Sequence, residues 1–234
     1  MDLMNNTRGK INTNTLLKGN KRELKNKLLT IKLPKPKLNE SKSLAKALKL
    51  RHTTREISEK KIPLQVLSIL LWAAYGINRR KGPFGIPGRT AASASNSQEI
   101  DLYVSLEKDV YIYEPIKHCL VPVAEGDYRK LAIGPGQQNI AVKAPVQLIY
   151  VADVYRLSNT KGFQEPGLQN PEVQKSYYFV DTGLIAGNVY LYAAASGLAA
   201  WFHNCDKIKL TSKLKLHSNQ RVLFGQTVGY PAKN

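Results

Sequence analysis

An uncharged run at residues 182–205 limits the fold of this chain more than any other feature. Its length requires that a membrane span be considered. Asn188, Ser196 and the many glycine and alanine residues argue against a span, because small residues on several faces suit a helix that other elements pack closely. We therefore predict a helix over residues 181–202 at the centre of a folded, non-membrane protein. A helix that is apolar all round needs cover on every side, so we expect a second subunit to supply part of that cover.

Size and cysteine content place this helix in a globular domain. The 234 residues are enough for one large domain, and 43% of them are hydrophobic. Cys119 and Cys205 make no disulfide framework, which favours a reducing compartment, and we predict a cytoplasmic protein. The sequence has no CxxC and no Cys/His cluster, so we expect no metal site.

Positive charge is concentrated at the start of the chain. The formal net charge is +18, and residues 1–50 hold 13 Lys and Arg against 3 Asp and Glu. Residues 1–40 are rich in Asn and Lys and lack the apolar core of a secretory signal. We interpret them as a flexible basic arm with one short strand or helix, ahead of a folded domain at 41–234. A solubilising role is favoured over binding of nucleic acid or an acidic membrane surface through this arm.

Hydrophobic periodicity divides the domain into helices and strands. Two runs predict helices, at 41–50 and at 62–78, the second with Gly76 near its end. Residues 99–115 are typical of a β-hairpin with its turn at 107–109. Continuous apolar runs at 144–153 and 220–231 predict buried strands, and a polar loop is expected at roughly 156–176.

Two polar motifs carry the functional signal. RHTTR (51–55) concentrates hydrogen-bond donors, and on its own it is explained by a capping box, Thr53 with Glu56, that starts a helix. The second motif, ASASNSQ (92–98), leads into the hairpin and offers close backbone approach with many hydrogen-bonding groups. Such a pair suits a polar ring system or a phosphate ester.

Taken in this order, the two motifs resemble those of the FMN-dependent nitroreductase family, which has R-x-S-x-R/K and then P-S-S-x-N-x-Q elements. Two further segments resemble the azoline (thiazole/oxazole) oxidase branch of the family most closely: LSILLWAAYGIN and DVYIYEPIKHCLVPV. Two others are similar to the family's central helix and closing strand: DTGLIAGNVYLYAAASGLAAWF and VLFGQTVGYP. The resemblance covers roughly residues 41–231. It implies an α+β fold, with a mostly antiparallel central sheet flanked by helices, in an intertwined homodimer that holds FMN at each subunit interface.

The resemblance also implies which residues bind FMN. Arg51 matches the arginine that grips the phosphate, with His52 and Thr53 beside it. Arg55 matches the basic residue under the flavin N1/O2 edge, where positive charge eases reduction.

Other matches lie further along the chain. Ser93 and Asn96 match a loop that reaches the flavin from the other subunit. Gln137, with Gln138 an equal claimant, lies where the family places an amide near the pyrimidine ring. His203 and Asn204 fall in a turn at 200–205 whose backbone N–H groups address the flavin.

Several departures from the family pattern bear on affinity and on the acceptor pocket. The family's proline and one hydroxyl are missing at 92–94. The family's basic phosphate ligands follow the last strand, and Lys233 is the one residue there that matches them. Both changes predict weaker FMN binding. Bulky Trp201 is expected to narrow the pocket over the flavin, and Phe163, Tyr177 and Tyr178 are expected to help shape it.

The resemblance predicts an FMN-dependent oxidoreductase in which NAD(P)H reduces the flavin and a small organic acceptor, such as a nitroaromatic or quinone, reoxidises it in a ping-pong cycle. The flavin carries the chemistry, so no side chain is named as a catalytic acid or base. One alternative is an FMN-dependent oxidase or dehydrogenase of a peptide azoline or small metabolite. Another is a flavin-binding module without enzymatic activity.

Overall fold

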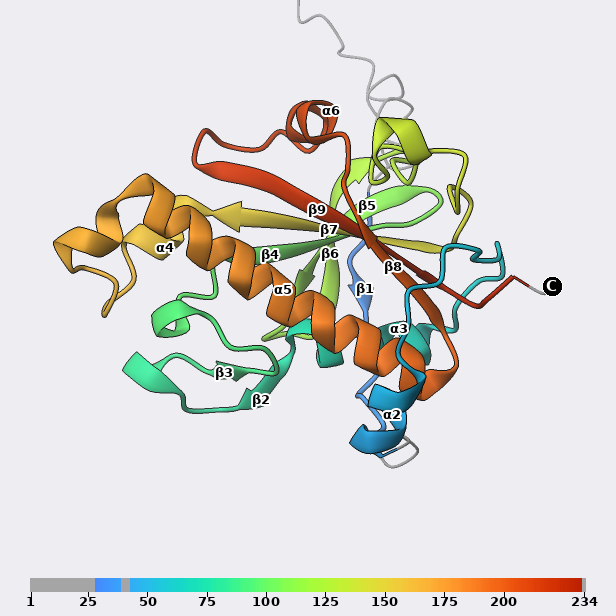
Figure 1. Cartoon of the computed structure of the whole chain (residues 1–234), viewed down its shortest axis with the longest axis horizontal. Helices are drawn as coiled ribbons and strands as arrows, with labels where there is room; N and C mark the ends of the chain where they lie inside the picture. Colours follow the sequence, from blue (N-terminus) through green and yellow to red (C-terminus); the bar gives the residue numbers. More distant parts are fainter. Residues whose placement is uncertain (1–27, 39–42, 233–234) are drawn as a thin grey trace, which may run out of the picture.

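A seven-stranded antiparallel sheet forms the frame of the protein (Figure 1). The computed structural model describes residues 28–38 and 43–232. The strand order is β1-β6-β5-β4-β7-β9-β8. These strands span Ile31–Lys32 (β1), Ile100–Ser105 (β4), Asp109–Glu114 (β5), Cys119–Glu125 (β6), Val146–Asp153 (β7), Ala199–His203 (β8) and Gln220–Gly229 (β9). The prediction of an α+β fold with a mostly antiparallel sheet is confirmed.

Helices and short 3-10 turns connect and cover these strands. The helices span Leu44–Leu50 (α2), Leu64–Tyr75 (α3), Val154–Ser158 (α4), Pro171–Ser196 (α5) and Lys207–Lys213 (α6). A small hairpin pairs Ile77–Arg79 (β2) with Gly88–Arg89 (β3). The 3-10 turns span Pro83–Gly85 (η2), Ala94–Asn96 (η3), Pro135–Gln137 (η4) and Pro166–Gln169 (η5).

Strand β7 is buried on both faces, as its continuous apolar run predicts. Leu148 and Tyr150 belong to the hydrophobic cluster that α3 and α5 share with the sheet. Ile149 and Val151, which point to the other face, belong to the cluster that includes Leu210 of α6. Successive side chains of a strand alternate between faces, so an uninterrupted apolar strand needs helices on both sides.

Helix α5 begins and ends at different residues from the predicted 181–202 helix. Asn170 caps its first turn by accepting a hydrogen bond from the Glu172 N–H, and Pro171 occupies the first helical position. Gly197, with φ of 70°, ends the helix in the left-handed conformation. The predicted end at 202 is therefore wrong, because residues 199–203 form β8. The predicted loop at 156–176 is wrong in part, since it contains the end of α4, η5 and the first turn of α5.

The other predicted elements largely agree with the structure. Helix α3, the hairpin of β4 and β5, and strands β7 and β9 lie within the predicted ranges. Helix α2 occupies 44–50, capped by Ser43. The capping box at Thr53 and Glu56 is wrong, because the chain has no helix between Arg51 and Pro63 and α3 starts only at Leu64.

One face of α5 carries exposed apolar side chains. Val180 is 60% exposed and Leu184 is 45% exposed, and Gly183 and Gly187 lie on the same face at helical spacing. The sheet covers the opposite face through Ile185, Val189 and Ala193. Within the described part of the chain, no helix is long and apolar enough to cross a membrane.

The described residues 28–38 run along the edge of the domain. β1 pairs with β6, and the Leu33 N–H donates to the carbonyl of His118 at 3.2 Å. The Ser68 hydroxyl of α3 donates to the carbonyl of Pro34 at 2.5 Å and lies 2.8 Å from His118 Nε2. The rest of the expected basic arm, and with it the alternative of nucleic-acid binding, falls on residues 1–27, outside the described residues.

Replacing Ser68 should loosen this edge. Ser68→Ala removes the donor to Pro34 and the partner of His118, at a residue that is fully buried. We expect a loss of about 1–3 kcal/mol in the free energy of unfolding, measured by urea denaturation. The control Ser176→Ala, whose exposed hydroxyl bonds only within α5, should change it by no more than about 0.5 kcal/mol. Equal effects of the two variants would contradict the role assigned to Ser68.

Candidate functional site

Residues 51–55 cross between α5 and β8. The Thr53 hydroxyl lies 3.1 Å from the Tyr190 hydroxyl, and that same hydroxyl accepts the Phe202 N–H at 2.8 Å. The Thr54 N–H donates to the carbonyl of Ala200 at 3.0 Å. Two motifs that are far apart in sequence, RHTTR and the segment at 200–205, are thus side by side in one chain.

The two arginines of RHTTR lie over aromatic rings. The Arg51 guanidinium is 5.7 Å from the centroid of the Tyr190 ring, and that of Arg55 is 5.9 Å from the centroid of the Trp201 ring. Neither forms an ion pair with a carboxylate among the described residues. His52 is exposed, and its Nδ1 lies 2.8 Å from the Leu50 carbonyl. This cluster therefore offers positive charge that no acidic side chain of the described chain neutralises, which suits an anion.

The expected turn at 200–205 is mainly strand. Ala199–His203 pairs with β9, and the chain turns only at Asn204, which is exposed. A side-chain carbon placed on Gly134 would lie 3.4 Å from the Asn204 carbonyl, so η4, which carries Gln137, starts beside this turn. The structure thus brings Gln137 and Asn204 to one neighbourhood.

His203 is buried at the end of β8. The centroid of its ring lies 4.4 Å from that of the Trp201 ring, and the two rings are tilted against each other. Burial lowers the pKa of His203 to about 4. Trp201 is only 2% exposed. Its ring is therefore part of the packing beneath the cluster rather than an open wall of a pocket.

The other residues expected to shape an acceptor pocket lie in the first turns of α5 and in the segment before it. Phe163 is buried and packs edge-on against Tyr177, with ring centroids 5.1 Å apart. Tyr178 packs against Phe179 at 5.1 Å. Phe163 anchors the segment between α4 and α5, because its carbonyl also accepts a hydrogen bond from the Gln169 amide.

The 93–98 loop is held in an unusual conformation. Ser95, Asn96 and Gln98 all have positive φ, near 50°. The Ser93 hydroxyl accepts the Gln98 N–H at 3.0 Å, and the Asn96 amide lies 3.4 Å from the carbonyls of Pro83 and Ile86. Backbone strain of this kind costs free energy, and it tends to persist where a loop has a function.

The two motifs contact different stretches of α5, one near its middle and one toward its C-terminus. The Ala94 N–H donates to the Asp181 carboxylate at 2.9 Å, whereas Thr53 meets Tyr190, nine residues further along the helix. At a rise of 1.5 Å per residue, these anchor points are about 14 Å apart along the axis. The structure of one chain therefore does not bring Ser93 and Asn96 next to Arg51 and Thr53.

A buried carboxyl pair lies beneath the 93–98 loop. Glu99 is fully buried and accepts the Ser97 hydroxyl at 2.6 Å, while its Oε1 has no hydrogen-bond partner among the described residues. Burial, and then the charge of Asp181, raise the pKa of Glu99 to about 8. Burial also raises the pKa of Asp181. Glu99 therefore carries a proton at neutral pH, which keeps two carboxylates from repelling each other under the loop.

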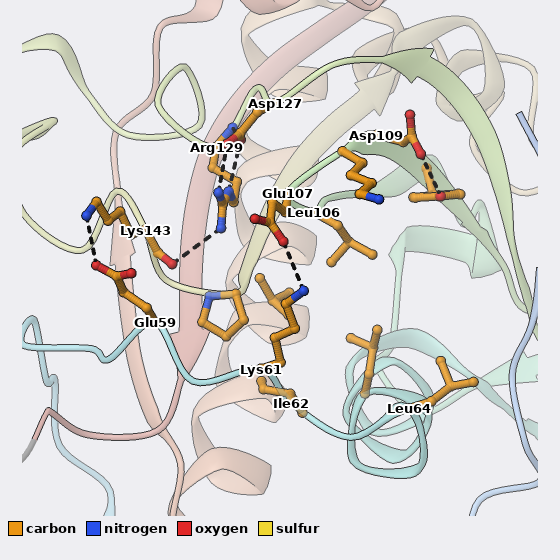
Figure 2. A pocket seen from close by; sticks show the side chains of 15 residues that line it. Glu59, Lys61, Ile62, Leu64, Leu106, Glu107, Asp109, Asp127, Arg129 and Lys143 are labelled. Carbon is orange, nitrogen blue, oxygen red and sulfur yellow. Dashed lines mark hydrogen bonds and ion pairs between the residues drawn. The ribbon is translucent and has the colours of Figure 1, made fainter. Parts of the chain in front are cut away.

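A cavity of about 790 Å³ opens at another edge of the domain (Figure 2). Ile62, Leu67 and Val146 contribute apolar walls. Three of its four cations are paired: Lys61 with Glu107 at 3.1 Å, Lys143 with Glu59 at 3.1 Å and Arg129 with Asp127 at 2.7 Å. This cavity contains none of the predicted site residues, and its four carboxylates make it a poorer place for a phosphate than the Arg51 cluster.

Comparison with known proteins identifies the family. A family model described as the Nitroreductase family matches residues 48–230. The chain belongs to the nitroreductase family. A crystal structure of a candidate nitroreductase from Ralstonia eutropha JMP134 is 33% identical, covers 88% of this chain and 90% of its own, and superposes with a TM-score of 0.74. A candidate nitroreductase of Methanocaldococcus jannaschii is 29% identical over 176 residues, which are 72% of this chain and 81% of that protein.

More distant structures share the nitroreductase fold. One is the E. coli microcin synthetase McbBCD complex, at 16% identity and a TM-score of 0.62, over 97% of this chain and 85% of that chain. Another is the NADPH:FMN oxidoreductase of Vibrio harveyi, at 18% identity and a TM-score of 0.54, over 82% and 70%. The predicted family is confirmed, and this nitroreductase is an oxidoreductase of the flavin-dependent kind.

Some residues of the site were not foreseen from the sequence. Tyr190, Asp181 and Glu99 all anchor predicted motifs, yet each lies in a run that also fits a plain core helix or strand. Asp181 and Tyr190 are nine residues apart, so they hold their motifs at different positions along α5. Lys233, which was predicted to contact the phosphate, falls outside the described residues.

Glu99 should impose a pH dependence on stability. Its pKa is raised in the folded chain, so its contribution is full below its ordinary pKa of 4.5 and is lost as the pH rises through about 8. We expect the melting temperature of the wild type to fall between about pH 5 and pH 8 more steeply than that of Glu99→Gln, which has no proton to lose. Glu165→Gln, at an exposed position, should keep the wild-type slope. Identical slopes for all three proteins would contradict the assignment.

Proposed function

We propose that this nitroreductase binds FMN and uses NAD(P)H to reduce a small organic acceptor, such as a nitroaromatic or a quinone. The observation that carries the proposal is the pair of arginines, Arg51 and Arg55, that have no carboxylate partner among the described residues and lie beside β8. The NADPH:FMN oxidoreductase of V. harveyi, which shares the fold, is the relative whose name supports this reaction.

The residues present fit the chemistry of FMN. Arg51 offers a planar guanidinium for two phosphate oxygens, and the neighbouring Thr53 offers a hydroxyl. Arg55 would place positive charge near the pyrimidine edge of the ring, and the backbone of 203–204 and the Gln137 amide would complete its polar contacts. When bound, FMN supplies the ring that accepts a hydride and passes the electrons on. The chain's own residues bind it, orient it and set its potential.

A second copy of the chain would complete the site. Ser93 and Asn96 belong to the loop that Asp181 anchors, whereas Arg51 belongs to the segment that Tyr190 anchors, about 14 Å further along the axis of α5. Within one chain the two motifs therefore contact different stretches of the helix, and a second chain would bring them together. The exposed face of α5, with Val180 and Leu184, would supply the contact, because glycines on that face allow close approach of a partner. We therefore propose a homodimer in which 93–98 of one chain faces 51–55 of the other.

Removing the Arg51 guanidinium should weaken FMN binding directly. We expect Arg51→Ala to reduce the binding free energy by about 1.5–3 kcal/mol, the range for a hydrogen bond to a charged group. Quenching of flavin fluorescence during titration measures this. Lys49→Ala, which removes an exposed positive charge two residues earlier, should leave the affinity nearly unchanged. An Arg51→Ala protein that binds FMN like the wild type would refute the assignment.

In a second candidate function, the flavin takes electrons from an organic substrate instead of delivering them to one. McbBCD shares the fold over 97% of this chain, which favours an FMN-dependent oxidase of a peptide azoline or a small metabolite. Initial rates separate the two. If the reductase proposal holds, NAD(P)H oxidation requires a quinone or nitroaromatic, and reciprocal plots at several acceptor concentrations are parallel, as in a ping-pong cycle. No acceptor-dependent oxidation of either NADH or NADPH, together with oxygen-dependent turnover of an azoline peptide, would favour the oxidase.

A further inference from the structure

A buried chain of hydrogen-bonding groups begins at His203. Its Nδ1 lies 2.9 Å from the Asn204 carbonyl, and its Nε2 lies 2.8 Å from the Thr227 hydroxyl. That hydroxyl lies 2.6 Å from the Oε1 of Gln147, whose Nε2 lies 3.2 Å from the Ala141 carbonyl. Gln147 and Thr227 are fully buried partners on β7 and β9.

The hydrogens of this chain can be assigned from its two ends. A carbonyl only accepts, so the Gln147 amide nitrogen must face Ala141 and its oxygen must face Thr227. The single hydroxyl hydrogen of Thr227 then goes to Gln147, and His203 Nε2 must carry a hydrogen to donate to Thr227. Nδ1 must carry one as well, because it faces the Asn204 carbonyl. The chain is therefore complete only when His203 is an imidazolium.

The same reasoning gives a neutral ring at His118. The Tyr113 hydroxyl, 2.8 Å from His118 Nδ1, donates to it, and Nε2–H donates to Ser68. The Ser68 hydroxyl hydrogen remains free for the Pro34 carbonyl. Every hydrogen bond of His118 is therefore formed with a neutral ring. The requirement for an imidazolium at His203 comes from its particular partners, and not from the burial of a histidine in general.

Burial disfavours the positive charge that the hydrogen bonds of His203 require. Burial lowers the pKa of His203 to about 4, and no charged side chain of the described chain shifts it. The groups that face the ring are Trp201 from β8, Gly225 and Thr227 from β9, the Ala132 carbonyl from the loop before η4, and, beyond the Trp201 ring, Arg55. When His203 is neutral, one of its two buried ring contacts has no hydrogen to form a hydrogen bond, and this costs free energy. The neutral ring and the imidazolium are therefore in competition.

We propose that His203 takes up a proton when negative charge arrives at the flavin, and that the chain through Thr227 and Gln147 holds this proton until the charge leaves. The proposal rests on the proposed function, which places FMN against residues 203–204. An opposite charge nearby favours the imidazolium, and the hydrogen-bond chain is already arranged to receive it.

The proton balance of the proposed reaction requires a second proton, which such a store would supply. A hydride from NAD(P)H carries two electrons and one proton and leaves NAD(P)⁺. Reduction of a quinone to a hydroquinone consumes two electrons and two protons. His203 takes the second proton from water onto a ring nitrogen in the first half-reaction and releases it in the second, so its own charge is restored after each cycle.

The hydrogen-bond chain can be tested by NMR of ¹⁵N-histidine-labelled protein as isolated. Thr227→Val keeps the shape of the side chain but removes the acceptor of Nε2–H, and Gln147→Leu frees the Thr227 hydroxyl to donate to a neutral ring. We expect either change to lower the pKa of His203 by about one unit or more, a tenfold loss of proton affinity. Thr211→Val, which alters an exposed hydroxyl on α6, should leave it unchanged. An equal His203 pKa in wild type and both variants would overturn the proposal.

Coupling to the cofactor is tested in the same samples by adding NADH or NADPH without oxygen. We expect both nitrogens of His203 to become protonated as the flavin colour bleaches, while His118 stays neutral. Bleaching without a change at His203 would overturn the coupling. If no flavin binds or bleaches, the proposed function fails and the coupling fails with it, and the variants still decide whether the chain favours the imidazolium.

Discussion

The Tyr190 hydroxyl is the contact on which the arrangement of the candidate site depends. It accepts a hydrogen bond from the Phe202 N–H and lies within hydrogen-bond distance of the Thr53 hydroxyl. One group on α5 therefore positions both the RHTTR segment and the edge strand β8. Thr54 adds a backbone bond to Ala200. Because Tyr190 is held by the packing of α5 on the sheet, the arginines are presented from a rigid base rather than from a free loop. A preorganised site of this kind loses less conformational entropy when an anion binds.

Helix α5 also separates the two predicted motifs within one chain. Its C-terminal half holds the arginine cluster, and its N-terminal half holds the 93–98 loop through Asp181. Because the pKa of Glu99 is raised, Glu99 stays protonated beside Asp181, and the two carboxyl groups do not repel each other. The same helix leaves Val180 and Leu184 exposed, one on each side of Asp181 along the chain. The proposed two-fold pair of chains would use this apolar face to join the separated motifs.

The sequence predicted the architecture better than the details of the site. Apolar runs located α3, β7 and β9, because burial on both faces leaves an unmistakable pattern. The end of α5 was missed because the apolar run continues through Gly197 into β8, and hydrophobicity alone does not distinguish a buried helix from a buried strand. Thr53 looked like a helix cap, and its actual partner, Tyr190, is 137 residues away. Contacts of that range, and the proton assignments at His203 and Glu99, depend on the fold.

The most direct test of the account is the visible spectrum of the purified protein under anaerobic conditions, before and after NADH or NADPH is added. The account predicts a yellow protein with bound flavin whose absorbance bleaches with at least one of the two nucleotides and returns when a quinone is added. A protein that binds flavin but keeps its full absorbance with both nucleotides would contradict the central claim, that this nitroreductase takes electrons from NAD(P)H.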